Sequence, residues 1–231
     1  MANVFLVGAA ALDGELERLR VIGQNFANAA TVGYRAEISV RPAVLFSTVL
    51  DNEPPATVLQ SAKLGALRQT SQTLDLALGG PGYFVLKSAE GYRYTRRGDF
   101  HVGTDGLVHS SKGYEVMGSG FGSLRNLDSI EIDHDGTLFD NGRPAGRIDV
   151  VEFGSDAVLV HEGGGVYSST SAPDSSSSPD VRQGYLEQSN VDPATETVQM
   201  MQVVRRVGMV TRAIRAYDSM LDAAVNELGN G

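Results

Sequence analysis

The sequence predicts an α+β protein: long N- and C-terminal helices, each able to form a coiled coil, around a central Gly-rich, mainly antiparallel β domain. Two observations predict this fold. Apolar residues recur every seven positions near both ends of the chain, and short alternating runs separated by Gly-containing turns fill the middle. The 231 residues, 42% of them hydrophobic, are enough for a buried core in one or two domains.

The first segment, 1–33, is predicted to be a helix from Ala2 to about Asn28 followed by a turn. Ala9 and Gly23 fall between the larger apolar residues and weaken the stripe. The stripe is narrow, as expected for a helix that packs against one or more partner helices and not against a globular core. Its larger members are Phe5, Leu12, Leu16, Leu19 and Phe26.

The segment 34–70 is predicted to be an irregular connector, because Pro42, Pro54 and Pro55 interrupt any periodicity. The β-rich domain is expected over 71–167. Within it, Thr104-Asp105-Gly106 and Asn141-Gly142 predict hairpin turns, and 148–153 reads in the alternation of a single strand. The segment 168–190 is expected to be a Ser/Pro-rich mobile linker followed by a lead-in strand.

The last segment, 191–231, carries the clearest pattern in the chain. Asp192 is placed to cap a helix, Pro193 suits its first turn, and Glu196 favours the positive end of the helix dipole. The apolar stripe extends over about four heptads, so this helix and the N-terminal one are expected to pair with each other, with neighbouring copies, or both. The stripe consists of Met200, Val203, Val207, Val210, Ile214, Tyr217, Leu221 and Leu228.

Composition excludes several classes of function. A net charge of -9 argues against nucleic-acid binding, and the absence of Cys removes disulfides and thiolate sites. No apolar run is long enough to insert into a membrane, and the N-terminal stretch lacks the basic residues of a cleaved signal peptide.

Motifs for chemistry are also weak. The four histidines, at 101, 109, 134 and 161, show no metal-ligand spacing. The run from Glu131 to Gly136 resembles the start of a calcium loop, but its twelfth position is Gly142 where a Glu is required. A strand and hairpin turn is the expected structure there. No catalytic residue, cofactor, metal or small-molecule substrate is predicted.

Three motifs, in this order along the chain, carry a resemblance to a known family. The first is the turn Asn28-x-x-Thr31-x-Gly33-Tyr34-Arg35. The second runs from Leu74 to Phe84 and continues through Tyr94-Thr95-Arg96-x-Gly98-x-Phe100. The third ends in Gln188, Ser189, Asn190 and Val191. In these motifs the chain resembles the rod and hook family of the bacterial flagellar basal body.

The resemblance implies a non-enzymatic structural subunit whose terminal helices form the core of a rod that transmits torque from motor to hook. It implies type III export without a cleaved signal, assembly in the periplasm, and an outward-facing β domain. The implied partners are other rod subunits, copies of the same chain and the export apparatus. The modest length and the closing segment from Ser219 to Gly229 look most like a proximal rod subunit, with a distal rod subunit as the alternative.

A reading from a different class stays open. The chain could be a soluble periplasmic β domain with binding or hydrolytic activity and helical tails. That reading predicts a pocket with convergent polar groups and tails that are dispensable for activity.

Overall fold

The computed structural model describes residues 2–40, 57–120, 130–154, 157–175 and 179–229, with side chains described except at 2–6, 57, 175 and 224–229. The chain divides into two compact units. The helical unit comprises Met1–Ala27, Ala36–Ser61 and Val191–Gly231. The β unit comprises Asn28–Arg35 and Ala62–Asn190. Each unit is therefore built from segments that are far apart in the sequence.

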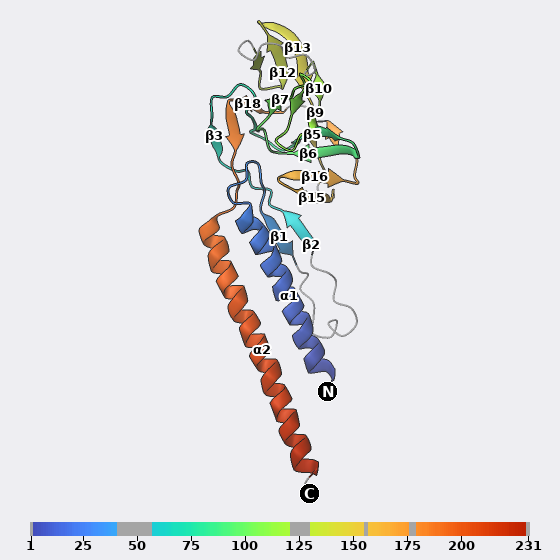
Figure 1. Cartoon of the computed structure of the whole chain (residues 1–231), viewed down its shortest axis with the longest axis vertical. Helices are drawn as coiled ribbons and strands as arrows, with labels where there is room; N and C mark the ends of the chain where they lie inside the picture. Colours follow the sequence, from blue (N-terminus) through green and yellow to red (C-terminus); the bar gives the residue numbers. More distant parts are fainter. Residues whose placement is uncertain (1, 41–56, 121–129, 155–156, 176–178, 230–231) are drawn as a thin grey trace. The chain divides into compact units, whose positions relative to one another are not determined.

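The helical unit contains two long helices, α1 (Ala2–Ala27) and α2 (Pro193–Gly229), which lie side by side (Figure 1). The predicted cap of α2 is confirmed. The carboxylate of Asp192 accepts hydrogen bonds from the Ala194 N–H at 3.1 Å and from the Thr195 hydroxyl at 2.5 Å. These bonds lower the pKa of Asp192, the Thr195 hydroxyl contributing most. The start of α2 is thus fixed by its own sequence.

The helical unit also contains a two-stranded antiparallel ribbon, β1 (Glu37–Val40) and β2 (Thr57–Gln60), in which Ile38 lies opposite Leu59. The prediction of an irregular connector over 34–70 is wrong for these strands and for β3 (Leu67–Gln69) of the β unit. The three prolines that suggested irregularity lie in 41–56, outside the described residues. Strands of three or four residues are too short to give a clear alternation in the sequence.

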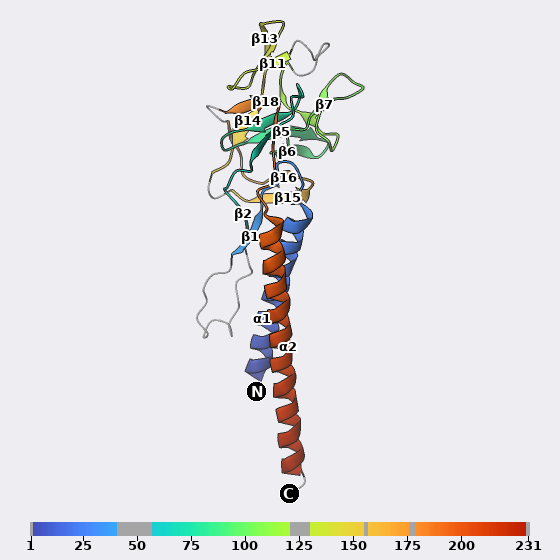
Figure 2. The ribbon, with the colours of Figure 1, turned by 90° about the vertical axis from the view of Figure 1, so that its left-hand side faces the viewer.

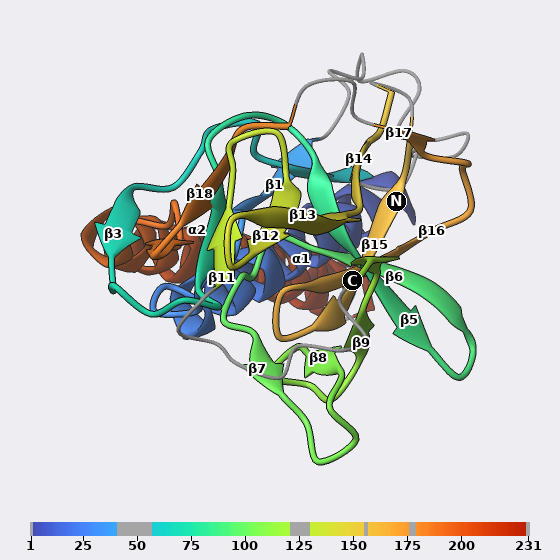
Figure 3. The same cartoon turned by 90° about the horizontal axis from the view of Figure 1, so that it is seen from above.

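The strands of the β unit are all paired antiparallel, so the predicted α+β class with an antiparallel β domain is confirmed. The largest sheet has the order β15-β16-β6-β5-β9-β8-β7, with β14 pairing both β5 and β17. A second sheet has the order β10-β13-β12-β11, and Figure 3 shows β11, β12 and β13 following one another. Two smaller pairs join β18 to β4 and β19 to β3. The remaining bounds are β4 (Leu76–Leu78), β5 (Tyr83–Ser88), β6 (Gly91–Thr95), β7 (His101–Val102), β8 (Val108–His109), β9 (Glu115–Val116), β10 (Gly118–Ser119), β11 (Ile130–Ile132), β12 (Thr137–Asp140), β13 (Arg143–Ile148), β14 (Val150–Glu152), β15 (Leu159–Gly163), β16 (Val166–Ser169), β17 (Asp174–Ser175), β18 (Val181–Gln183) and β19 (Tyr185–Glu187).

The core of the β unit has two parts, divided by the alternation along β5. Phe84 and Leu86 point into the larger cluster, which includes Leu76, Leu138 and Ile148. The alternate residues of the same strand, Tyr83 and Val85, join a smaller cluster that also contains Tyr94, Val151 and Tyr167. Because successive strand residues face opposite sides, one strand serves both clusters.

The turns predicted from the sequence are found where expected. Thr104-Asp105-Gly106 lies between β7 and β8, and Asn141-Gly142 joins β12 to β13. Asn141 and Gly142 have φ angles of 51° and 73°, the left-handed pair that a two-residue hairpin turn requires. The segment that resembled a calcium loop forms the β11–β12 hairpin.

Two predictions about the later strands need correction. The single strand over 148–153 is wrong, because Ile148 ends β13 and Val150 begins β14 in a different sheet. Asp149 connects β13 in one sheet to β14 in the other. Its N–H donates to the Met117 carbonyl at 3.1 Å, and its carbonyl accepts from the Val85 N–H at 3.3 Å. The expected linker begins inside β16 and contains β17, although 176–178 lie outside the described residues.

Candidate assembly surface

The two long helices pack antiparallel, and three contacts define their alignment. Gly8 faces Ile214, so closely that a Cβ at Gly8 would lie 3.1 Å from the Ile214 Cδ1. Glu15 and Arg206 form an ion pair at 3.1 Å, and the Asn25 side chain donates to Glu196 at 3.3 Å. Residue numbers fall along α2 as they rise along α1, which fixes the antiparallel direction seen in Figure 2.

The helices differ in length: α2 has 37 residues and α1 has 26. Gly8 lies level with Ile214 and α1 begins six residues earlier, at Ala2. Because the helices are antiparallel, Ala2 lies near the level of Met220. The last part of α2, roughly 15 Å at 1.5 Å per residue, extends beyond its partner. Met220 is 70% exposed at this point. The end of α2 therefore offers a helix surface that α1 does not cover.

The predicted seam residues fall into four groups. Val203 is fully buried, whereas Leu16 and Phe26 are about half exposed. Phe5 and Leu228 lie outside the residues whose side chains are described. The remainder are partly buried, namely Leu12, Leu19, Met200, Val207, Val210, Ile214, Tyr217 and Leu221. The helix pair thus covers part of the stripe and leaves part accessible, and the role of these residues as an assembly seam stays a prediction.

A second apolar row on α2 was missed in the sequence. Val198, Met201 and Val204 follow one another at three-residue spacing and are all exposed, although Val203, which lies among them in the sequence, is fully buried. We call these three residues the outer stripe. The polar residues around them, such as Gln202 and Arg205, concealed the row because its spacing is not that of the heptad.

Asn25 of α1 connects its own helix to β1 and to α2. This connection was not predicted from the sequence. The Asn25 side chain donates to the Glu37 carbonyl at 2.9 Å and accepts from the Glu37 N–H at 2.8 Å. The amide thus bonds both backbone groups of Glu37, in the way that a residue of a neighbouring strand bonds its partner. The same amide donates to Glu196. Glu196 Oε2 is buried without a hydrogen-bond partner among the described residues, and burial raises the pKa of this carboxyl. Glu196 is therefore a buried contact of α1 and not only a partner of the helix dipole.

Two of the motif segments meet inside the β unit. In the first, the Thr31 N–H donates to the Asn28 carbonyl at 3.0 Å and its hydroxyl donates to the Asn28 side chain at 3.2 Å. The Gly33 N–H then donates to the Glu187 carbonyl at 2.7 Å, and the Asn190 N–H donates to the Tyr34 carbonyl at 3.3 Å. The ends of the β unit are thus hydrogen-bonded to each other.

The other residues of these motifs have mixed surroundings. Tyr34 is buried and its ring packs edge-on against His161 at 5.6 Å. The Gln188 N–H donates to the Ala66 carbonyl at 2.9 Å, and Ser189 is partly buried. Val191 is buried and belongs to the helical unit.

All three motifs converge on a buried ion pair. The Arg96 Nε donates to Glu187 at 2.7 Å, and its Nη atoms donate to the carbonyls of Leu78, Gly80 and Gly82 at 2.7 to 2.9 Å. Both charged side chains are almost completely buried. Burial lowers the pKa of Arg96, while the Glu187 carboxylate opposes that shift. Arg35 lies 3.9 Å from the same carboxylate. The pair therefore links Arg96, which directly follows β6, and the backbone of residues 78–82 to Glu187 of β19, which is a structural role.

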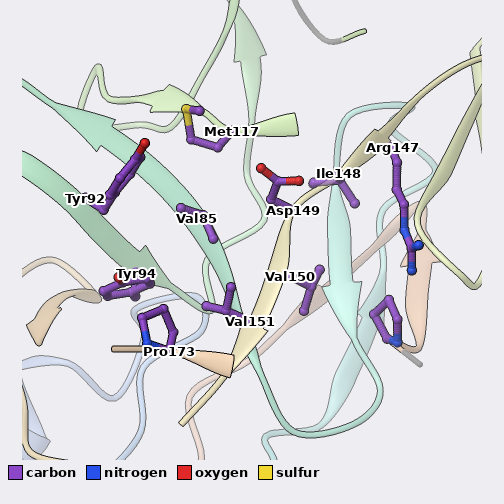
Figure 4. A pocket seen from close by; sticks show the side chains of 11 residues that line it. Val85, Tyr92, Tyr94, Met117, Arg147, Ile148, Asp149, Val150, Val151 and Pro173 are labelled. Atoms are coloured by element: carbon purple, nitrogen blue, oxygen red, sulfur yellow. The ribbon is translucent and has the colours of Figure 1, made fainter. Parts of the chain in front are cut away.

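The β unit also contains a groove of about 500 Å³, shown in Figure 4. Val85, Tyr94, Met117 and Val151 contribute apolar or aromatic surface, and Arg147 and Asp149 contribute charges. None of the four histidines is among the described lining residues. The wall is mainly apolar.

The histidines have ordinary surroundings. His109 lies 2.9 Å from Asp105, and His134 lies 3.1 Å from Asp180. Burial lowers the pKa of His161, which packs against Tyr167. Within the described part of the chain, no group of three or more His, Asp or Glu residues could hold a metal ion. In the same part, no helix has the length and apolarity needed to cross a membrane.

Comparison with known families gives a consistent result. Residues 182–227 match the family described as flagellar basal body rod FlgEFG protein C-terminal. Residues 77–140 match the flagellar hook protein FlgE/F/G D1 domain. These segments contain the third motif with most of α2, and much of the second motif with the strands around it. Both matched models describe flagellar rod and hook proteins.

Relatives extend the similarity to nearly the whole chain. The chain is 26% identical to the flagellar basal-body rod protein FlgF of Caulobacter vibrioides, over 99% of each chain. It is 29% identical to FlgF of Rhizobium meliloti over 92% of each. It is 27% identical to the rod protein FlgG of Bacillus subtilis, over 90% of this chain and 92% of that one. Over nearly its whole length, the chain is similar to flagellar basal-body rod proteins.

Proposed function

We propose that this chain is a structural subunit of the proximal flagellar rod, polymerising through its terminal helices to transmit torque from motor to hook. The observation that carries the proposal is the helical unit, which retains exposed apolar side chains after α1 and α2 have packed together. Leu16, Phe26 and the outer stripe remain accessible, and α2 extends beyond α1. Exposed apolar surface on long helices is typical of a protein–protein interface.

The geometry suits a load-bearing filament. Helices aligned along one axis present parallel contacts that can share a twisting load. A contact between two different surfaces of one subunit generates an open filament when the rotation between successive copies does not close a ring. In this proposal, 1–33 and 191–231 form the rod core as coiled-coil partners, 71–167 form the outer domain, and 34–70 and 168–190 connect them.

The remaining parts of the proposal rest on the family. The relatives named FlgF and FlgG are basal-body rod proteins. We assign the chain the same location, the periplasmic part of the basal body, reached by type III export without a cleaved signal. Its partners are rod subunits below and above it, and it has no enzymatic activity. FlgF is favoured over FlgG because the relative that spans 99% of both chains is a FlgF.

A matched pair of substitutions on α2 tests the proposal. Val207→Asp places a charge on the partly buried seam, whereas Ala213→Asp places the same charge at an exposed position of the same helix. Sedimentation and electron microscopy of the full-length protein over a range of concentrations should show polymers for the native chain and Ala213→Asp, and not for Val207→Asp. Near-ultraviolet circular dichroism of the tyrosines should show an intact β unit in all three. A native chain that stays monomeric at every concentration contradicts the proposal.

Amide hydrogen exchange tests the state of the helices before assembly. Long helices with few covered faces are marginal alone and gain stability from packing. We expect fast exchange along the end of α2 in the monomer and slow exchange in the polymer. Equal protection of these amides in the monomer and in the polymer would show that the helices are fully formed before assembly.

The groove of the β unit is the observation that favours the second candidate, a binding or hydrolytic β domain. Among the described residues its wall is predominantly apolar, and Arg147 and Asp149 are its charged members. A binding or hydrolytic site needs several convergent polar groups for orientation and specificity. Under that reading, Val207→Asp would leave the protein's activity unchanged.

A further inference from the structure

The ribbon of the helical unit has an exposed apolar face. Ile38, Val40 and Leu59 are 49%, 42% and 52% exposed, and Ile38 lies directly opposite Leu59. Residues i and i+2 of a strand, and residues opposite each other on paired strands, share a face. The three side chains therefore form one patch, which we call the ribbon face.

The other face of the ribbon is turned toward the helices. The backbone of Glu37 is bound by Asn25 of α1. Ser39 lines a cleft of about 460 Å³ together with Gly14 and Arg18 of α1. Because Ile38 and Val40 alternate with these residues, the ribbon face points away from α1.

The outer stripe of α2 is a patch of similar character. Val198, Met201 and Val204 are 49%, 48% and 56% exposed. Val203, which lies on the opposite side of the helix from Met201 by the helical repeat, is fully buried. The outer stripe therefore also points away from α1.

The two patches occupy the same level along the helices. Asn25 binds both Glu37 at the start of the ribbon and Glu196 in the first turn of α2. The cleft that contains Ser39 is also lined by Arg206 and Met209 of α2. The ribbon thus lies at the same level along the helices as the stretch of α2 that carries the outer stripe. Since both patches face away from α1, which packs against both elements, they do not cover each other within one chain.

We propose that the ribbon face of one copy docks onto the outer stripe of α2 in a second copy, side by side at nearly the same level. This inference rests on the proposed function and adds a lateral contact to it. A second copy is the occupant that accounts for both patches at once, because one repeated contact covers each of them. The contact joins two different surfaces, so every added copy leaves a free ribbon face at one side and a free outer stripe at the other.

Cysteine cross-linking tests the contact directly, because the chain contains no Cys of its own. Ile38→Cys and Met201→Cys are made as separate full-length variants, and Thr104→Cys in an exposed turn of the β unit serves as the control. After oxidation at concentrations where the protein polymerises, the mixture of Ile38→Cys and Met201→Cys should give disulfide-linked dimers. Each variant alone, and Thr104→Cys mixed with either, should give none.

The outcomes separate this inference from the proposed function. Dimers from Ile38→Cys alone or from Met201→Cys alone would show that like patches meet, and would overturn the inference. Polymers without any cross-link in the mixture would overturn it while leaving the proposed function intact. A native chain that does not self-associate at any concentration would overturn both.

A charge exchange provides a second test that does not depend on oxidation. Ile38→Lys and Met201→Glu each place a charge in one patch, and we expect each variant alone to polymerise at least tenfold less readily. Mixed in equal amounts they should recover, because lysine then meets glutamate at one contact and native patches meet at the next. Circular dichroism should show native folding of both variants, since both residues are exposed. Failure of the mixture to recover, with both variants folded, would contradict the pairing.

Discussion

Arg96 and Glu187 form an ion pair at 2.6 Å with essentially no exposure to solvent of either side chain. The guanidinium also binds the carbonyls of Leu78, Gly80 and Gly82, and the Gly65 N–H donates to the carboxylate at 3.0 Å. Each charge is therefore compensated by a full set of hydrogen bonds. Removal of either partner would leave the other charged and buried.

Arg96→Met and Glu187→Gln should each destabilise the protein by about 3–5 kcal/mol, because an uncompensated charge in the interior is costly. Lys87→Ala is the control, since Lys87 pairs with Glu115 at the surface and such pairs contribute about 0–1 kcal/mol. Urea unfolding of the full chain, followed by the tyrosine signal of the β unit, measures the difference. Equal losses for Arg96→Met and Lys87→Ala would contradict the structural role of the pair.

Gly33 combines a left-handed backbone with a close contact. Its φ is +65°, and a Cβ there would lie 2.6 Å from the backbone of Arg96 and Arg97. Gly142, with φ of +73° and open space around it, isolates the conformational cost, roughly 1–2 kcal/mol for an added side chain. We expect Gly33→Ala to lose clearly more stability than Gly142→Ala in the same urea unfolding experiment. Similar losses would show that the turn shifts freely to accept the methyl group.

Two glycines of α1 offer a test of the helix pair. Gly23→Ala should stabilise the helix by about 1 kcal/mol, because no atom lies within 4 Å of the new methyl group. Gly8→Ala should gain less, since Ile214 lies 3.1 Å from that position. In an Ile214→Ala background the two glycine substitutions should give similar gains. Thermal unfolding monitored at 222 nm compares each glycine variant with its own parent, which is either the native protein or Ile214→Ala. An undiminished gain for Gly8→Ala in the native background would argue against this contact.

Glu196 predicts a pH dependence of helix stability. Burial raises the pKa of Glu196 above its usual 4.5, so the folded state holds the proton more tightly than the unfolded state. The stabilisation is complete below the unfolded pKa and is lost as the pH rises through the folded pKa. Compared with Glu196→Gln, which has no such proton, the native protein should lose melting temperature as the pH rises from about 4.5. A difference in melting temperature between the two proteins that stays constant across this pH range would contradict the raised pKa of Glu196.

The helices and hairpins could be predicted because their signals are local. The seam from Met200 to Leu221 and the Asp192 cap need only neighbouring residues to be recognised. Asn141-Gly142 is likewise specific, because few dipeptides accept two left-handed residues.

The contacts that the sequence did not reveal depend on distant partners. Arg96 and Glu187 are 91 positions apart, and the residues around each of them do not predict that the two side chains pair. The ribbon was missed because its strands have four residues each. The alternation over 148–153 was misleading, because apolar residues can continue through a point where the chain leaves one sheet for another. The heptad pattern also did not reveal that burial differs along the seam, where Val203 is fully buried and Leu16 is exposed.

The pairing of β3 with β19 and of β4 with β18 has a consequence for the chain during synthesis. A ribosome releases Leu67–Leu78 long before Val181–Glu187, so the early strands remain without their partners until translation is nearly complete. The Gly33 N–H likewise acquires its acceptor only when Glu187 emerges. These two strand pairs can therefore close the β unit only late in synthesis.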